Sequence, residues 1–227
     1  MSDLYRFEER PAAPGAPLLI LLHGTGGAPH QLIAMGADLM PEAHLVAPEG
    51  DVLEHGAPRF FKRTGEGVYD MSDLARATHK MQAFIRHRTE AARPSSVSVL
   101  GYSNGANILA SVLFAPHAGV DRAVLMHPLI PFEAPPQPGV AGLPVLITAG
   151  KRDPIAPAVF TEKLAGYFDQ QGADTRLVWH EGGHELRLEE LNAVRSFLAD
   201  VPPRVRRADP PSPDAAQTGR LRKSIPV

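Results

Sequence analysis

Ser103 lies in the sequence Gly101-Tyr102-Ser103-Asn104-Gly105, between an apolar run typical of a buried strand and a segment with helical spacing. The two glycines lack the Cβ atoms that would collide where a strand turns sharply into a helix. Such a turn lifts a serine hydroxyl above the carboxyl edge of a sheet, where a base can take its proton. The spacing therefore predicts a nucleophilic serine. The alternative is a strand-to-helix turn with a capping serine, because so short a motif also arises by chance.

Two further residues have the types that a serine nucleophile requires. His184 lies in the glycine-rich stretch Glu181-Gly182-Gly183-His184 and is the expected general base. Asp153 follows a strand-like run and is the expected acid, which would orient the imidazole. Asp153 could instead cap the following helix, and Glu133 is the rival acid. The chain order Ser, Asp, His is that of α/β-hydrolases, and together with the position after a strand it favours Asp153.

The segment His23-Gly24-Thr25-Gly26-Gly27 follows another apolar run and provides the fourth component of the predicted active site, after the serine, the base and the acid. We expect the backbone N–H groups of Thr25 and Asn104 to hold the oxyanion of an acyl-transfer reaction. Loss of one such donor typically costs about 3 kcal/mol of transition-state stabilisation. His23 precedes the serine in the chain, so we interpret it as a structural histidine rather than the base. This chemistry needs no metal or organic cofactor.

The segment His180-Glu181-Gly182-Gly183-His184 also fits the H-E-x-x-H pattern of zinc proteases. That pattern works on a helix, where the two histidines share a face. Residues 175–179 are β-prone, and each of the two glycines would cost about 1 kcal/mol in a helix. We therefore expect no metal site here. His117, His127 and the remaining histidines are predicted to be surface or packing residues.

Apolar runs alternate with helical spacing along the chain, which predicts an α/β fold with a mainly parallel sheet and helices on both faces. Ligands then bind beyond the carboxyl ends of the strands, where the candidate residues fall. Strands are expected near 18–22, 44–48, 96–101, 121–127, 144–149 and 175–180, and helices near 32–39, 72–92, 104–114, 160–168 and 191–198.

Length and composition limit the other possibilities. The 227 residues suffice for one large domain, which we place at 1–200, and the net charge of −2 indicates neither a nucleic-acid partner nor membrane insertion. Residues 201–227 contain six prolines and six basic residues, so we expect a disordered tail there. Cysteine is absent, and no signal peptide or membrane-length apolar run is visible, which favours a cytoplasmic protein. A homodimer is compatible with the sequence.

The substrate pocket is harder to place from the sequence. Residues 128–142 are too few for a cap domain, so we expect an open cleft. The connection 49–70 is long, and long connections are often functional. Its basic residues Arg59, Lys62 and Arg63 are interpreted as a solvated face, with the alternative that the loop closes one side of the pocket. The predicted pocket residues are Phe60, Phe61, Tyr102, Leu129, Ile130 and Ile155.

These motifs together resemble the α/β-hydrolase superfamily and, within it, the phospholipase/carboxylesterase family, which is related to acyl-protein thioesterases and dienelactone hydrolases. The resemblance runs from about Leu18 to Leu198. It rests on the stretches 22–27, 101–106, 153–154 and 183–186. Residues 58–63 and 67–70 are similar to a bacterial predicted-esterase subgroup, some of whose members are associated with hydroquinone or quinone stress.

The resemblance implies a hydrolase without a cap that cleaves carboxylic esters of small or medium substrates through an acyl-enzyme on Ser103. Dienelactone hydrolases carry a cysteine nucleophile, and acyl-protein thioesterases usually carry glutamine where this chain has Asn104. Both departures favour a carboxylesterase. A thioesterase or lysophospholipase with the same triad is the alternative. A non-catalytic binding protein of the same fold is a further one.

Overall fold

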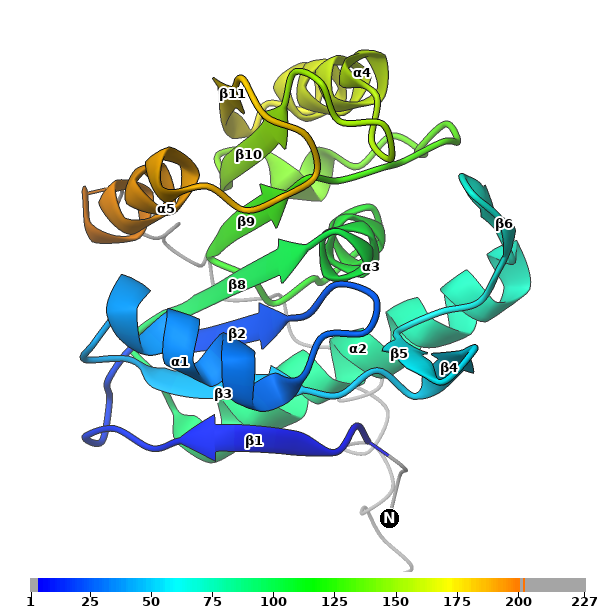
Figure 1. Ribbon diagram of the computed structural model, residues 1–227. Coiled ribbons are helices and arrows are strands. Elements are labelled where there is room, and N and C mark those ends of the chain that lie inside the picture. Colours follow the sequence, from blue (N-terminus) through cyan, green and yellow to red (C-terminus); the bar gives the residue numbers. More distant parts are fainter. Residues whose placement is uncertain (1–3, 201, 203–227) are drawn as a thin grey trace, which may run out of the picture.

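The computed structural model describes residues 4–200 and 202. A seven-stranded sheet forms the centre, in the order β1-β3-β2-β8-β9-β10-β11 (Figure 1). All strands are parallel except β1, which pairs antiparallel with β3 at one edge. The strands are β1 Phe7–Arg10, β2 Leu18–Leu22, β3 His44–Pro48, β8 Val97–Tyr102, β9 Arg122–Met126, β10 Pro144–Gly150 and β11 Asp174–His180. The predicted α/β class is thus confirmed.

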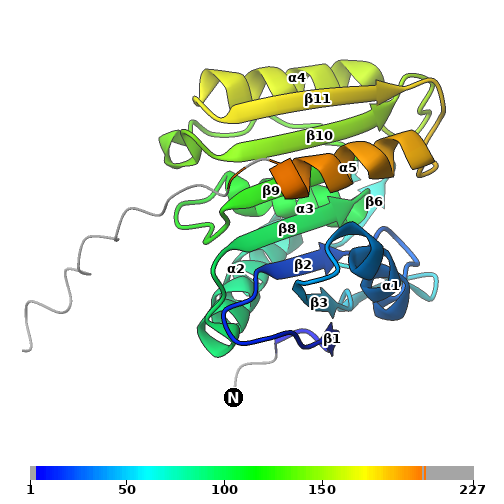
Figure 2. The same ribbon diagram turned by 90° about the vertical axis from the view of Figure 1, so that its left-hand side faces the viewer.

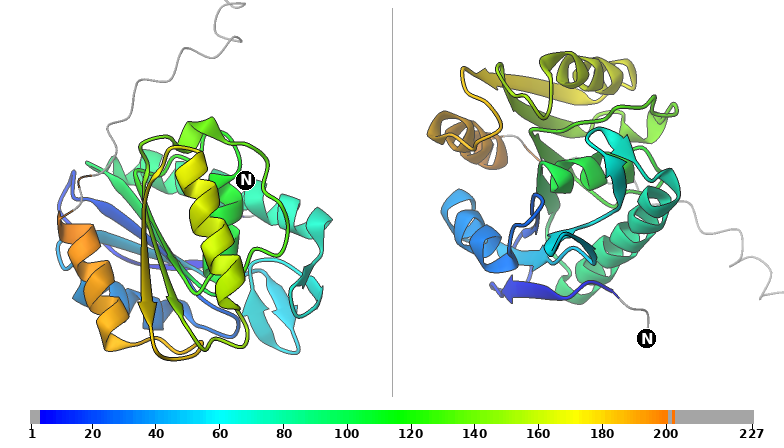
Figure 3. Two further views of the ribbon diagram at one scale, coloured as in Figure 1. Left: turned by 90° about the horizontal axis from the view of Figure 1, so that it is seen from above. Right: turned by 45° about the vertical axis from the view of Figure 1, so that its right-hand side comes forward.

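Helices cover both faces of the sheet. Helices α1 (Pro29–Leu39) and α5 (Leu188–Asp200) lie on one face (Figure 2). Helices α2 (Met71–Ala92), α3 (Asn104–Leu113) and α4 (Ala158–Gln170) lie on the other. Figure 3 shows the sheet between α4 and α5. A 3₁₀ turn, η1 (Pro138–Val140), interrupts the connection from β9 to β10.

The apolar strand residues explain this layering. Along β2, Leu18, Ile20 and Leu22 pack into the cluster under α2, α3 and α4. Leu19 and Leu21 pack into the cluster under α1 and α5. Successive side chains of a strand point to opposite faces, so a continuous apolar run suits a strand that is covered on both sides. Among the described residues, no helix combines the length and hydrophobicity needed to cross a bilayer.

The connection between β3 and α2 forms two small hairpins that the sequence pattern did not predict. The first pairs β4 (Val52–Glu54) with β5 (Ala57–Arg59), and the second pairs β6 (Arg63–Gly65) with β7 (Val68–Tyr69). In Figure 1 these strands stand beyond the carboxyl ends of β2 and β8, beside the first turns of α2 and α3. They therefore extend the edge of the sheet at which the predicted site residues lie.

Candidate active site

Ser103 occupies a sharp turn between β8 and α3. Its backbone has φ 52° and ψ −116°, a conformation that non-glycine residues rarely adopt. A Cβ added to Gly101 would lie 2.3 Å from the carbonyl oxygen of Gly105, and one added to Gly105 would lie 2.1 Å from that of Leu22. Only glycine fits at either place. The close approach of α3 to β8 and β2 therefore depends on both glycines of the motif.

The structure brings the three predicted catalytic residues together at the carboxyl edge of the sheet. The Nε2 atom of His184 lies 2.9 Å from Oγ of Ser103. Its Nδ1 atom lies 2.7 Å from Oδ2 of Asp153. The side chain of Asp153 is fully buried, whereas that of His184 is 18% exposed. With a proton on Nδ1 donated to Asp153, Nε2 of His184 is free to accept the hydrogen of the serine hydroxyl.

Asp153 accepts four hydrogen bonds. Its Oδ1 accepts from the backbone N–H groups of Ile155 and Ala156, at 2.8 and 2.9 Å. Its Oδ2 accepts from His184 and, at 2.8 Å, from Nδ1 of His127. Burial alone raises the pKa of Asp153, but these hydrogen bonds outweigh it, and the net shift is downward. The carboxylate is therefore ionised and fully satisfied.

The rival acid Glu133 lies elsewhere. It forms an exposed ion pair with Lys163 at 3.1 Å and lines a separate surface hollow. The helix-capping alternative for Asp153 is met only in part. Its Oδ1 closes the turn that leads toward α4, while Oδ2 faces the two imidazoles. The same carboxylate therefore caps the turn through Oδ1 and holds the imidazoles through Oδ2.

The segment 23–27 lies beside the serine, as predicted for an oxyanion loop. Thr25 and Asn104 line the same cavity as Ser103 and His184. Among the turn, loop and cap hydrogen bonds of the described backbone, none uses the N–H of Thr25 or of Asn104. Arg59 donates to the Thr25 hydroxyl at 2.7 Å, and the N–H of Gly26 donates to Pro58 at 3.0 Å. The loop is thus held by the first hairpin of the 49–70 connection.

His23 is fully buried beneath this loop. Its Nε2 accepts from the backbone N–H of Gly50 at 2.9 Å, and its Nδ1 lies 2.7 Å from the carbonyl oxygen of Gly24. Burial lowers its pKa, so the ring is neutral. Both nitrogens bond to backbone, which agrees with the interpretation of a structural histidine.

A cavity of about 200 Å³ lies above the serine. Of the predicted pocket residues, Tyr102, Leu129 and Ile155 line it. Its other walls come largely from the two hairpins of the 49–70 connection and from the oxyanion loop: Thr25, Arg59, Arg63, Glu66, Gly67 and Tyr69. The connection 49–70 therefore does form one side of the pocket, but through polar residues.

The prediction that Phe60, Phe61 and Ile130 line the pocket is wrong. Both phenylalanines are completely buried in the core, and Ile130 borders the separate hollow beside Glu133. The backbone N–H of Phe60 donates to Oδ1 of Asn104 at 2.8 Å, and its ring packs on His23. Burying two aromatic rings stabilises the fold more than exposing them in a polar cleft.

Arg59 also differs from the prediction of a solvated loop residue. It is only 3% exposed and forms an ion pair with Glu54 at 3.1 Å. Glu54 also accepts from Nε of Arg63 at 2.8 Å. The two arginines therefore reach the cavity with part of their charge already balanced.

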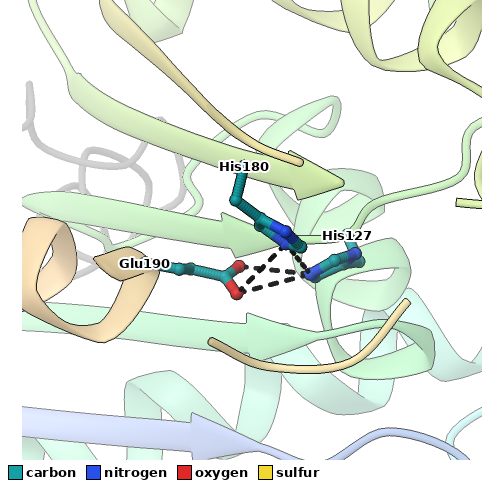
Figure 4. A group of neighbouring side chains, drawn as sticks. All are labelled: His127, His180 and Glu190. Carbon is teal, nitrogen blue, oxygen red and sulfur yellow. Dashed lines mark hydrogen bonds and ion pairs between the residues drawn. The ribbon is translucent and has the colours of Figure 1, made fainter. Parts of the chain in front are cut away.

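A second group of titratable side chains, drawn in Figure 4, contacts Asp153 through His127, and sequence reasoning missed it. It consists of His127, His180 and Glu190, all buried. The Nε2 atom of His127 lies 3.3 Å from Nε2 of His180 and 3.3 Å from Oε1 of Glu190. His127 directly follows β9, which lies between the serine strand β8 and the acid strand β10. This position after a central strand could have identified His127 as a site residue from the sequence, because the carboxyl ends of neighbouring parallel strands lie side by side.

The donor pattern of this group fits a hydrogen-bonded network better than a metal centre. Nδ1 of His180 accepts from the backbone N–H of Gly182 at 3.0 Å, so a neutral His180 carries its proton on Nε2. A metal would need the lone pair at that Nε2. The glutamate of the H-E-x-x-H pattern, Glu181, is also unsuited to act in such a centre, because its side chain is exposed and forms an ion pair with Lys151.

Comparisons with known proteins agree with the fold and the motifs. The family model described as Phospholipase/Carboxylesterase matches residues 6–201. The chain is 43% identical over 186 residues to the putative hydrolase MhqD of Bacillus subtilis (strain 168), which covers 81% of this chain and 93% of MhqD.

Two solved structures are similar along most of their length. A protein of unknown function from Agrobacterium tumefaciens, Atu2452, superposes with a TM-score of 0.80 at 53% identity and covers 86% of this chain and 96% of its own. A Bacillus cereus carboxylesterase superposes with a TM-score of 0.82 at 32% identity and covers 87% of this chain and 94% of its own. The chain therefore belongs to the phospholipase/carboxylesterase family and is an esterase-type hydrolase with an α/β-hydrolase fold.

Proposed function

We propose that the protein is a serine hydrolase that cleaves carboxylic esters of small or medium substrates through an acyl-enzyme on Ser103. The observation that carries the proposal is the unbroken chain of contacts from Ser103 through His184 to Asp153, at 2.9 and 2.7 Å, beside an open cavity. Each atom along this chain has the donor or acceptor character that acyl transfer requires.

In the proposed reaction, Ser103 Oγ attacks the ester carbonyl while His184 Nε2 takes its proton. Asp153 holds the Nδ1–H tautomer and stabilises the imidazolium that forms. The N–H groups of Thr25 and Asn104 hold the oxyanion. The imidazolium then protonates the departing alcohol, and water, activated by the same imidazole, releases the acid and restores the serine.

The size and walls of the cavity favour short acyl groups. Its volume is about 200 Å³, and the chain between β9 and β10 contains only one 3₁₀ turn among the described elements. Arg59, Arg63 and Glu66 make one wall polar. Such a site suits a small ester better than a long alkyl chain, which needs an extended apolar groove.

The test uses a fluorophosphonate probe on the wild type, on Ser103→Ala and on Ser95→Ala, an exposed serine that precedes the amino end of β8, opposite the end that carries Ser103. We expect labelling of the wild type and the Ser95 variant and none of the Ser103 variant. A panel of p-nitrophenyl esters from acetyl to palmitoyl, with matched thioesters, then defines the substrate. Equal labelling of the Ser103 variant would remove the serine assignment, and a preference for thioesters or long chains would favour the thioesterase or lysophospholipase alternative.

A further inference from the structure

Asp153 Oδ2 is shared by two imidazoles. Nδ1 of His184 lies 2.7 Å from this oxygen, and Nδ1 of His127 lies 2.8 Å from it. The two ring centres are 5.1 Å apart. The acid of the proposed triad thus has a second, fully buried histidine partner that the proposed mechanism does not use.

The far nitrogen of His127 faces a buried carboxylate. Its Nε2 lies 3.3 Å from Oε1 and 3.4 Å from Oε2 of Glu190, and neither side chain is exposed. Because Nδ1–H is donated to Asp153, a neutral ring would turn the lone pair of Nε2 toward these oxygens. A proton on Nε2 replaces that repulsion with an ion pair between His127 and Glu190.

Glu190 is itself fixed in place. The Thr148 hydroxyl donates to its Oε1, and the backbone N–H of Arg187 donates to its Oε2 at 3.3 Å. Glu190 comes from α5, whereas His127 follows β9, so the ion pair links a helix on one face of the sheet to the end of a central strand. Figure 4 shows the carboxylate of Glu190 directed at both His127 and His180.

We propose that His127 is a positioning residue that holds Asp153 from behind and, as an imidazolium paired with Glu190, balances its negative charge until His184 takes up the serine proton. This inference rests on the proposed roles of Ser103, His184 and Asp153. It adds to them a chain of alternating charge: Glu190 negative, His127 positive, Asp153 negative, His184 positive during the reaction.

The groups that face His127 support this charge. Asp153 and Glu190 are carboxylates, and the ring of Tyr102 stands edge-on at 5.8 Å. Nδ1 of His180 accepts from the backbone N–H of Gly182, so its proton is on Nε2. This Nε2 lies 3.3 Å from Nε2 of His127 and 3.7 Å from Oε2 of Glu190, so both imidazoles direct an N–H toward the same carboxylate. The remaining neighbour is His184. With His127 charged, the buried cluster carries one net negative charge at rest, and transfer of the serine proton to His184 neutralises it.

The direction of the pKa shifts is consistent with this arrangement. Burial alone lowers the pKa of His127, but the hydrogen bonds to Glu190 and Asp153 outweigh burial, and the net shift is upward. Burial alone raises the pKa of Glu190, yet hydrogen bonds from His127 and Thr148 turn the net shift downward. Both shifts place the shared proton on the histidine.

The consequence concerns the working pH. A positive charge on His127 would lie about 5 Å from the ring of His184 and would repel a second positive charge there before the reaction. Removal of the charge from His127 should therefore raise the pH below which Ser103 loses reactivity, by about one unit.

The test is the rate of fluorophosphonate labelling of Ser103 as a function of pH. His127→Asn keeps a short N–H donor for Asp153 and tolerates the backbone φ of 51° at this position, but it cannot carry the charge. His117→Asn is the matched control, because His117 is exposed and has φ 58°. Glu190→Gln removes the partner of the charge. We expect the acid midpoint to rise by about one unit in the His127 variant, by less in the Glu190 variant, because it removes a negative charge as well, and to stay unchanged in the control.

A uniform loss of rate with an unchanged midpoint would show that His127 only supports the fold, and it would overturn the proposal. A second measurement needs no reaction at all: ¹⁵N NMR of the free wild-type enzyme near pH 7 should show both nitrogens of His127 protonated. A neutral ring would overturn the proposal even in an active enzyme. Failure of the wild type to label would count against the proposed function, whereas the resonances decide the charge of His127 in either case.

Discussion

His184 and His127 present the same atom to the same carboxylate oxygen, yet the structure prepares them for opposite tasks. The other nitrogen of His184 meets the Ser103 hydroxyl at the cavity wall, and the side chain is 18% exposed. The other nitrogen of His127 meets Glu190 in the interior, and the side chain is fully buried. The partner of Nε2, rather than that of Nδ1, therefore distinguishes the proposed base His184 from the proposed cation His127.

The backbones that carry the two rings differ as well. His184 lies in a loop that passes close to the end of β10, where only glycine fits: a Cβ on Gly150 would lie 2.1 Å from the carbonyl oxygen of Gly183. His127 directly follows β9, and its backbone N–H donates to Thr148 at 2.8 Å. The histidine proposed to exchange protons is on a loop, and the one proposed to keep its proton is joined to the sheet.

The largest effect should come from His184→Gln, which removes the proposed base. We expect kcat/KM for a small ester to fall by about 10⁴-fold or more, because the serine would have no group to take its proton. His87→Gln is the matched control, since His87 is exposed on α2. Similar losses in the two variants would mean that the imidazole of His184 has no special role.

Asp153→Asn should come next, with a loss of about 10⁴-fold in kcat. All four partners of this side chain are N–H donors, so the amide NH₂ of asparagine must face at least one donor. The variant should also lose about 1–3 kcal/mol in its free energy of unfolding, measured by urea denaturation. Asp174→Asn, at an exposed residue at the start of β11, is the control. Near-normal turnover in Asp153→Asn would assign the acid elsewhere.

Glu190→Gln should affect stability in a pH-dependent way. The pKa of Glu190 is lowered in the folded state, so its contribution is present above its ordinary value and lost as pH falls through the folded value. The pKa of His127 is raised, so its contribution is present below its ordinary value and lost as pH rises through the folded value. Glu190 and His127 therefore both stabilise the folded state at pH values between the ordinary pKa of a glutamate and that of a histidine.

The loss in the free energy of unfolding caused by Glu190→Gln should therefore be largest near pH 6, at about 3 kcal/mol, and smaller at about pH 4 and pH 9. Urea unfolding of wild type and variant at the three pH values measures it. A deficit that is independent of pH would mean that the ion pair with His127 is absent.

The smallest effect should come from Tyr102→Phe. The Tyr102 hydroxyl donates to the carbonyl oxygen of His184 at 2.7 Å and steadies the loop that carries it. Its ring also packs against both imidazoles, and phenylalanine retains that contact. We expect kcat to fall about fivefold, as for the loss of one hydrogen bond, with an unchanged acid midpoint. A shifted midpoint would instead place the tyrosine in the charge network.

Local patterns predicted much of the fold and of the candidate site. Continuous apolar runs such as Leu18–Leu22 identified the buried strands, and the family and α/β class are confirmed. The residues Ser103, Asp153 and His184 could be singled out because each follows a strand, and the structure brings them together.

The features that the sequence did not predict depend on contacts between segments that are distant in the sequence. Phe60 looks like a pocket residue in a long loop, but its backbone bonds to Asn104, forty-four residues away, and this contact turns the ring into the core. Glu190 looks like a surface residue in the first turn of α5, and only the packing of that helix brings it to His127. No local periodicity records either contact.

The 49–70 connection is bonded to both halves of the proposed oxyanion hole, through Arg59 to Thr25 and through Phe60 to Asn104. The same connection supplies Arg63, Glu66 and Tyr69 to the substrate cavity. A change in this connection would therefore affect both the choice of substrate and the reaction rate. An engineer who grafts hairpins from a relative to change the preferred ester should transfer them together with residues 25 and 104, or expect a slower catalyst.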